Sequence, residues 1–345
     1  MDALQIIRSM PKVELHLHLE GAFTLESLYR LIRKYGGDPD VQDIDDLRRK
    51  FVFTDFRHFI EIWCWKNKFY REPADIEDMA YSTVFSMSQK NIIYSEVFFS
   101  PWDFVNPEMP FQAVTEAVIA GVRRAESECP IGIGLIADLV RDRGHQTVNK
   151  RLDEITPYRN EVIGVGLGGS EKEFPAEWFT AVFKEAKRRG FHVVAHAGEA
   201  GGADSIWSAL KNLNAERIGH GVRATEDPAL IEYLKSKQIP LEVCVNSNLK
   251  TKIFPFPADH PVRRFFDDGL LITINSDDPT MFGMDLNDEF ILLFNEYKFT
   301  LPEIRQLTVN AIKASFADDL YKAQLTHAHE EFWKQITLSN GGFLK

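Results

Sequence analysis

The chain lacks the features that mark several common protein classes. It has three cysteines in 345 residues and no Cys-x-x-Cys pair, so neither a zinc ribbon nor a thioredoxin-like site is indicated. Lys and Arg total 40 against 51 Asp and Glu, and the net charge of −11 argues against a nucleic-acid or anionic-membrane surface. No apolar run reaches the ~20 residues that span a bilayer, and the N-terminus lacks the pattern of a signal peptide. Together with the few cysteines, this predicts a cytoplasmic protein with no nucleic-acid or membrane partner.

Several catalytic motifs are also absent. There is no His-Glu-x-x-His, which disfavours a zincin peptidase, and no His-x-Glu paired with Pro-Cys-x-x-Cys, which excludes a cytidine-type deaminase site. There is no P-loop and no Gly-x-Ser-x-Gly elbow. The main alternative fold, an open doubly wound sheet, usually carries Gly-x-Gly-x-x-Gly after its first strand, and this chain does not.

What the chain does contain is a regular alternation of apolar and amphipathic segments. The apolar runs are nearly continuous in Val, Ile and Leu, which is typical of parallel strands buried on both faces. We expect strands at residues 13–19, 92–100, 131–140, 162–168, 192–197, 217–220, 241–246 and 270–276. Helical segments lie between them, so the sequence predicts a (β/α)₈ TIM-type barrel. No linker or repeat divides the chain, and residues 1–345 are expected to form a single domain.

Two segments fall outside this alternation. Residues 24–90 are too long for one crossover helix, and we interpret them as a helical insertion after the first strand. The insertion is rich in aromatic residues at 51–60, Trp63 and Trp65. These aromatics either form an apolar lid over a pocket or simply pack the insertion on the barrel. Residues 286–337 are expected to form C-terminal helices that complete the barrel.

The segment Val13–Gly21 carries the strongest chemical signal. His16 and His18 are two residues apart in an apolar run, so on a strand their side chains point the same way. Two converging imidazoles form half of a metal site. The competing interpretation is a strand with two polar residues on its wet face.

Other predicted strands end in polar residues too, and a barrel forms its active site at these carboxyl ends. Each residue alone has a structural explanation; Asp277 and Asp278 precede Pro279 and could cap a helix. Their coincidence at one end of one barrel instead predicts a centre for zinc or a similar divalent ion, with a position left for water. We assign four ligands: His16, His18, His196 and Asp277. Glu199 is left for proton transfer, and His220 is left to orient or deprotonate the water.

These segments together resemble the adenosine deaminase family, metal-dependent purine deaminases of the amidohydrolase superfamily. The matching blocks follow the family's order over most of the chain: Leu15–Ala22, Gly166–Glu171, His196–Ala200, Ile218–Gly221 and Ser276–Pro279. The resemblance implies one catalytic Zn²⁺ per chain and hydrolysis of a 6-amino group to 6-oxo with release of ammonia. The predicted strand at 162–168 has no lysine to bridge two metals, which favours the mononuclear form.

The resemblance also implies residue roles. Hydroxide on the metal would attack C6 of the purine, Glu199 would protonate N1, and His220 and Asp277 would interact with the hydroxide. The remaining substrate contacts would come from His18, from Glu20 near the ribose 5′ end, from the Gly169 N–H at N3 and from Asp278 at N7.

The expected ligand is a small purine nucleoside or base. Adenosine-type members usually have Asp at position 20, whereas adenine-type relatives often have Glu, as here. The block Ile218–Gly221 instead matches the adenosine-type form. We therefore expect adenosine as the substrate, with adenine or a 5′- or N6-modified adenosine as the alternative. A generic amidohydrolase and a non-catalytic purine-binding barrel are weaker hypotheses, and the sequence gives no indication of oligomeric state.

Overall fold

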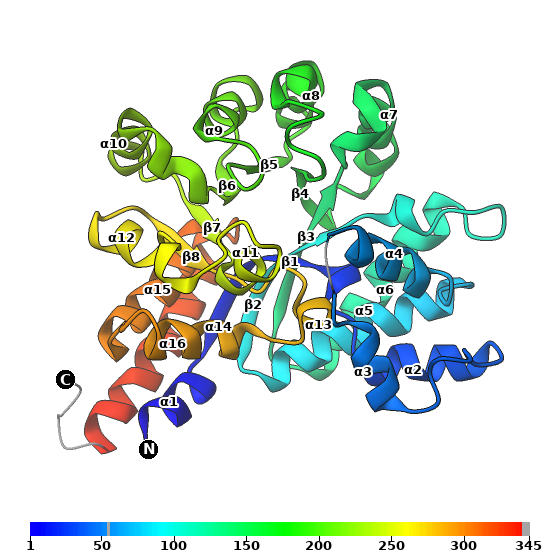
Figure 1. Cartoon of the computed structure of the whole chain (residues 1–345), viewed down its shortest axis with the longest axis horizontal. Coiled ribbons are helices and arrows are strands. Elements are labelled where there is room, and N and C mark those ends of the chain that lie inside the picture. The colour runs from blue at the N-terminus through cyan, green and yellow to red at the C-terminus, as the bar shows by residue number, and fades with distance from the viewer. Residues whose placement is uncertain (54–55, 340–345) are drawn as a thin grey trace.

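Eight parallel strands form the centre of the molecule, as shown in Figure 1, and the predicted (β/α)₈ barrel is confirmed. The structure is a computed structural model that describes residues 1–53 and 56–339. The strands are hydrogen-bonded in chain order: β1 Lys12–His18, β2 Ile92–Phe99, β3 Gly132–Asp138, β4 Val162–Leu167, β5 His192–Ala197, β6 Arg217–His220, β7 Leu241–Val243 and β8 Ile272–Ile274. Their side chains are almost entirely buried, which explains the nearly continuous apolar runs of the sequence.

Helices surround this sheet and connect its strands (Figure 1). They are α1 Ala3–Ser9, α2 Leu25–Lys34, α3 Ile44–Lys50, α4 Phe56–Asn67, α5 Pro73–Gln89, α6 Phe111–Glu128, α7 Gly144–Ile155, α8 Thr180–Arg188, α9 Ala203–Ser208, α10 Pro228–Lys237, α11 Val245–Lys250, α12 Val262–Asp267, α13 Pro279–Phe282, α14 Leu286–Asn295, α15 Leu301–Ala314 and α16 Asp319–Ser339. Among the described residues, no helix is both long and apolar enough to cross a bilayer.

The barrel closes between β8 and β1 through a short polar segment that follows β8. The N–H of His18 donates to the carbonyl of Asp277 at 2.8 Å, and the N–H of Asp277 donates to the carbonyl of His16 at 3.1 Å. Two residues before Asp277, the Asn275 side-chain oxygen accepts from the N–H of Leu15 at 2.8 Å. Closure of the barrel therefore brings Asp277 next to the two histidines of β1.

The predicted insertion is present as α2–α5, and its aromatic residues pack it both on itself and against α13. Trp65 donates to the Asp38 carboxylate at 3.0 Å within the insertion, so this residue packs the insertion on itself. Phe59 instead stacks on Phe282 of α13, with ring centroids 5.7 Å apart. Residues 54–55 of the aromatic stretch lie outside the described part of the chain.

The last two strands are only three residues long, shorter than the sequence suggested. β7 ends at Val243, because the chain turns at Cys244 and begins α11 at Val245. The N–H of Asn246 at the start of this helix donates to the buried Glu289 carboxylate at 3.0 Å. β8 ends at Ile274, and the residues that follow it close the barrel and form the site described next.

Candidate metal centre and active site

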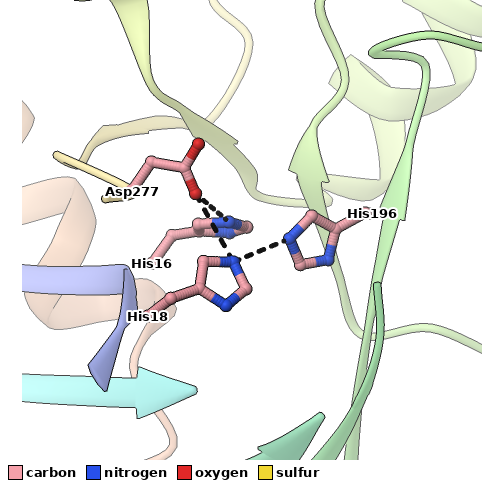
Figure 2. A group of neighbouring side chains, drawn as sticks. All are labelled: His16, His18, His196 and Asp277. Carbon is pink, nitrogen blue, oxygen red and sulfur yellow. Dashed lines mark hydrogen bonds and ion pairs between the residues drawn. The ribbon is translucent and has the colours of Figure 1, made fainter. Parts of the chain in front are cut away.

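Four side chains converge at the carboxyl ends of the strands, as Figure 2 shows. Each offers one ligand atom, and these atoms all lie within 4.8 Å of one another: His16 and His18 from β1, His196 from β5, and Asp277 from the segment after β8. The Asp277 Oδ1 atom is 3.4 Å from the Nε2 atoms of both His16 and His18. The Nε2 atoms of His18 and His196 are 3.1 Å apart. The four residues predicted as ligands are thus brought together.

The backbone explains how these side chains meet. A register shift between Glu14 and Leu17 interrupts the pairing of β1 with β2 at His16, whereas His18 pairs with Phe98. Asp277 has a φ of 63°, in the left-handed region that non-glycine residues rarely adopt. This conformation is held by the barrel-closing hydrogen bonds, and such strained positions are typical of functional sites.

The electrostatics of the cluster fit a divalent cation. The Nε2 atom of His16 and the Nδ1 atom of His196 are buried and have no hydrogen-bond partner among the described residues. Burial lowers the pKa of His196 well below its usual range, so this imidazole is neutral and can offer a lone pair. Burial also opposes a charge on His16, but the neighbouring carboxylates of Asp277 and Glu242 outweigh this effect and raise the pKa of His16 to about 10. The two carboxylates therefore favour a positive charge here, which a bound metal ion would supply.

A second group, His220, Cys244 and Asp277, also has ligand atoms within 4.8 Å. Burial raises the pKa of the Cys244 thiol well above its usual range. Because the thiolate is the form that binds metal, this group is a poorer candidate than the three histidines with Asp277.

The sequence analysis missed three buried charged residues, Glu242, Arg217 and Glu96, that form a network with His16. The Nδ1 atom of His16 lies 2.7 Å from the Glu242 carboxylate, which leaves Nε2 as the lone-pair atom. Glu242 also accepts from Arg217 at 2.6 Å, and Arg217 forms a second ion pair with Glu96. All three charged side chains are almost fully buried. A charged residue inside an apolar strand segment is the signal that could have indicated Glu242.

Removing the charge of Glu242 should weaken metal binding. In Glu242→Gln we expect the metal affinity to fall by about 10- to 100-fold, since a carboxylate partner raises the basicity of a ligating imidazole. Competition with a chelator measures this affinity. Glu216→Gln is the matched control, because Glu216 pairs with His192 Nδ1 at 3.0 Å on the same barrel but away from the cluster. Equal affinities in both variants would contradict the role given to Glu242.

The loop after β5 is organised by Glu171, another residue to which the sequence analysis gave no role. Its carboxylate accepts from the N–H groups of Glu199 at 3.1 Å and of Ala200 and Gly201 at 2.8 Å, and also from Gly198. These bonds fix the backbone from which the Glu199 side chain extends. Burial raises the pKa of Glu199, so this carboxyl holds its proton more readily than an exposed glutamate.

His220 and Glu199 face one another beside the cluster. Their Nε2 and Oε2 atoms are 3.7 Å apart. His220 ends β6 with a φ of 59°, a second left-handed residue at this end of the barrel. On the opposite side, Ser247 of α11 donates from its hydroxyl to the Oδ2 atom of Asp277 at 2.6 Å, which orients that carboxylate.

Asp278 and Gly169, two predicted purine contacts, lie at this end of the barrel. The Asp278 Oδ1 atom is buried and has no partner among the residues that the structure describes, and burial together with the charge of Asp277 raises the pKa of Asp278 well above its usual range. A protonated Asp278 can donate to an acceptor such as purine N7. A Cβ on Gly21 would lie 1.9 Å from this same Oδ1 atom, so only glycine fits there. Gly169 has a φ of 95° and takes a conformation that also favours glycine.

Glu20 and Lys66 are two buried groups of opposite charge that interact electrostatically. The Glu20 carboxylate is 2% exposed and accepts from the Ser100 N–H at 2.7 Å. Burial raises the pKa of Glu20 to about 7. Lys66 of α4 is fully buried, donates to the Asn67 side chain at 2.7 Å and packs over Trp63. Burial lowers the pKa of Lys66 to about 8, although the charge of Glu20 opposes this. Sequence reasoning did not identify Lys66, whose aromatic neighbours were the only signal.

Comparison with known proteins gives a consistent set of matches. The sequence model of the adenosine deaminase family matches residues 11–331. An adenine deaminase of Crocosphaera subtropica is 34% identical over 320 residues, which cover 93% of this chain and 98% of the relative.

Two solved structures share the fold. The crystal structure of an adenine deaminase from Arthrobacter aurescens is 31% identical, covers 94% of this chain and all of its own, and has a TM-score of 0.87. An amidohydrolase from Burkholderia ambifaria with bound zinc also has a TM-score of 0.87; it is 24% identical and covers 98% of this chain and 96% of its own.

Proposed function

This chain belongs to the adenosine deaminase family, and we propose that it converts adenine to hypoxanthine and ammonia. Its general activity is hydrolysis of an adenine-type C–N bond. The finer assignment differs from the adenosine expected from the sequence, because the relatives point to the alternative, adenine. The observation that carries the proposal is the convergence of three histidines and Asp277 beside Glu199 and His220.

We propose one Zn²⁺ per chain, held by His16, His18, His196 and Asp277. The nitrogen-rich donor set suits this ion, as does the Nε2 atom of His16, which has no hydrogen-bond partner in the described part of the chain. When bound, zinc lowers the pKa of water and so supplies a nucleophile near neutral pH.

The other side chains then act on the purine. Glu199 delivers a proton to N1, which weakens the aromaticity of the ring and opens C6 to attack; its raised pKa favours this role. His220 lies 3.7 Å from Glu199 and would interact with the water that attacks C6. Asp278 donates to N7, and the Gly169 N–H donates to N3. These contacts would orient the purine so that C6 faces the four metal-binding side chains.

Glu20 supports adenine as the substrate. Adenine carries an N–H at N9, whereas adenosine carries ribose there. The buried Glu20 carboxylate has acceptor capacity beyond its bond to Ser100 and can accept from that N–H. Its side chain is one methylene longer than the Asp of adenosine-type members and takes space that the ribose would need. Discrimination by a buried hydrogen-bonding group is stronger than discrimination by apolar contact.

The test compares adenine and adenosine side by side by ultraviolet absorbance. We expect kcat/KM for adenine to exceed that for adenosine, and Glu20→Asp to shift the ratio toward adenosine by about tenfold or more. Glu26→Asp, an exposed residue of α2, is the matched control and should leave the ratio unchanged. A wild-type preference for adenosine would overturn the proposed substrate. An unchanged ratio in Glu20→Asp would remove the role given to Glu20.

A further inference from the structure

A chain of hydrogen bonds runs from Val262, the first residue of α12, to His220. The Val262 N–H donates to the Nδ1 atom of His260 at 3.2 Å. The Nε2 atom of His260 lies 3.2 Å from the Oδ1 atom of Asn248. The Nδ2 atom of Asn248 in turn lies 3.3 Å from the Nδ1 atom of His220. We call His260, Asn248 and His220 the relay. Their side chains are at most 4% exposed, so their hydrogen bonds are made within the protein.

The direction of every bond follows from its first donor. A backbone N–H can only donate, so Nδ1 of His260 must be an unprotonated acceptor. A neutral His260 then carries its one proton on Nε2 and donates it to Asn248. Burial lowers the pKa of His260 to about 3, which is consistent with a single proton on this ring. With its oxygen engaged by His260, Asn248 has only its NH₂ group to offer to His220.

The direction of the Asn248–His220 bond determines which nitrogen of His220 carries the proton. Because Nδ1 of His220 accepts from Asn248, the proton of the neutral ring must lie on Nε2. Nε2 is the atom that faces Glu199. The catalytic pocket therefore meets an N–H donor on His220 and no lone pair.

We propose that Asn248 and His260 are positioning residues that hold His220 in the Nε2–H tautomer, so that His220 orients the attacking water as a donor and does not remove its proton. This inference deepens the proposed function and rests on it. It decides between the two roles that the sequence left open for His220. The proton shed by the water then passes to Glu199, which has already delivered its own proton to N1. Oxygen adds to C6 as the C6–N1 double bond opens toward the protonated N1. The remaining hydroxyl proton then moves to the amino group, which leaves C6 as ammonia, and His220 neither gains nor loses a proton.

Contacts with neighbouring residues hold the side chains of the relay in position. Asn248 lies in α11, whose first turn is held by the bond from the Asn246 N–H to Glu289. The ring of His260 packs edge-on against Phe254, with centroids 5.1 Å apart. The ring of His220 is held at Nδ1 by Asn248, and its backbone has a left-handed φ of 59° at the end of β6.

Asn248→Asp tests the proposal, because a carboxylate of nearly the same shape accepts from both histidines. We expect it to move the His220 proton to Nδ1 and present a bare Nε2 to the pocket. Histidine ¹⁵N spectra report the tautomer directly, and the His220→Gln spectrum identifies the His220 signals. Turnover should fall by about 10²- to 10⁴-fold in kcat with little change in KM, as for a wrong catalytic-histidine tautomer elsewhere. Metal content should persist.

The matched control is Asn310→Asp, which removes a side-chain donor to the Ile272 carbonyl outside the relay. It should leave the tautomer and kcat unchanged. The wild-type spectrum, assigned with His220→Gln, does not depend on Asn248→Asp: a proton on Nδ1 of His220 would overturn the proposal even if Asn248→Asp failed to fold. A folded Asn248→Asp whose tautomer reverses while kcat holds would also overturn it. If the protein deaminated no 6-aminopurine, the proposed function would fail, whereas the tautomer spectra would still test the relay.

Discussion

Glu199→Gln is expected to lower kcat by about 10²- to 10⁴-fold, the usual contribution of a positioned general acid. The amide keeps the shape of the side chain and the backbone bonds to Glu171, but it has no acidic proton for N1. Metal content and binding of a purine inhibitor should largely persist, because neither uses this proton. Steady-state kinetics with metal analysis of the same sample measures both effects.

The pKa of Glu199 also predicts how kcat should change with pH. The raised pKa of Glu199 means that its carboxyl stays protonated to higher pH than an ordinary glutamate. As pH rises through that pKa, the acid is lost, so kcat should fall. Glu199→Gln should lack this descending limb. Glu173→Gln, which changes an exposed carboxylate, serves as the control and should retain both the limb and the wild-type kcat. Unchanged turnover in Glu199→Gln would contradict the role of Glu199.

Removal of the metal is expected to have an effect at least as large. The Lewis acidity of a catalytic ion contributes several kcal/mol to the transition state, so the stripped protein should lose more than about 10³-fold in kcat. The four ligands lie on, or close to, three barrel strands, and circular dichroism should show that the stripped protein keeps its fold.

Reconstitution completes this test. Adding about one equivalent of Zn²⁺ should restore turnover, and the loaded protein should melt at a higher temperature than the stripped one, since a ligand that binds only the folded state stabilises it. A stripped protein that still turns over adenine at the original rate would contradict a metal-dependent mechanism. Activity that required two equivalents would contradict the single-metal site.

The parts of the site that the sequence could predict are those with a local signal. The spacing of His16 and His18 on one strand determines that both side chains point the same way. His196 and His220 were placed because each ends an apolar strand, and the carboxyl ends of parallel strands meet at one face of a barrel. The family resemblance rested on these same blocks, and it is confirmed.

The supporting residues could not be predicted in this way, because their roles depend on neighbours far away in the chain. Glu242 is 226 residues from His16, and Glu171 is 28 residues from the Glu199 N–H that it accepts. Asn248 was hidden for a different reason. The segment 241–246 was interpreted as strand to its end, whereas α11 begins at Val245 and points the helix residues Ser247 and Asn248 toward Asp277 and His220.

The most direct test of the central claim is the reaction of adenine itself with metal-loaded protein. Hypoxanthine is measured by absorbance, ammonia by a coupled assay and bound zinc in the same preparation. The account predicts one hypoxanthine and one ammonia for each adenine consumed, with about one zinc per chain. A fully metal-loaded protein that left adenine unchanged would contradict it.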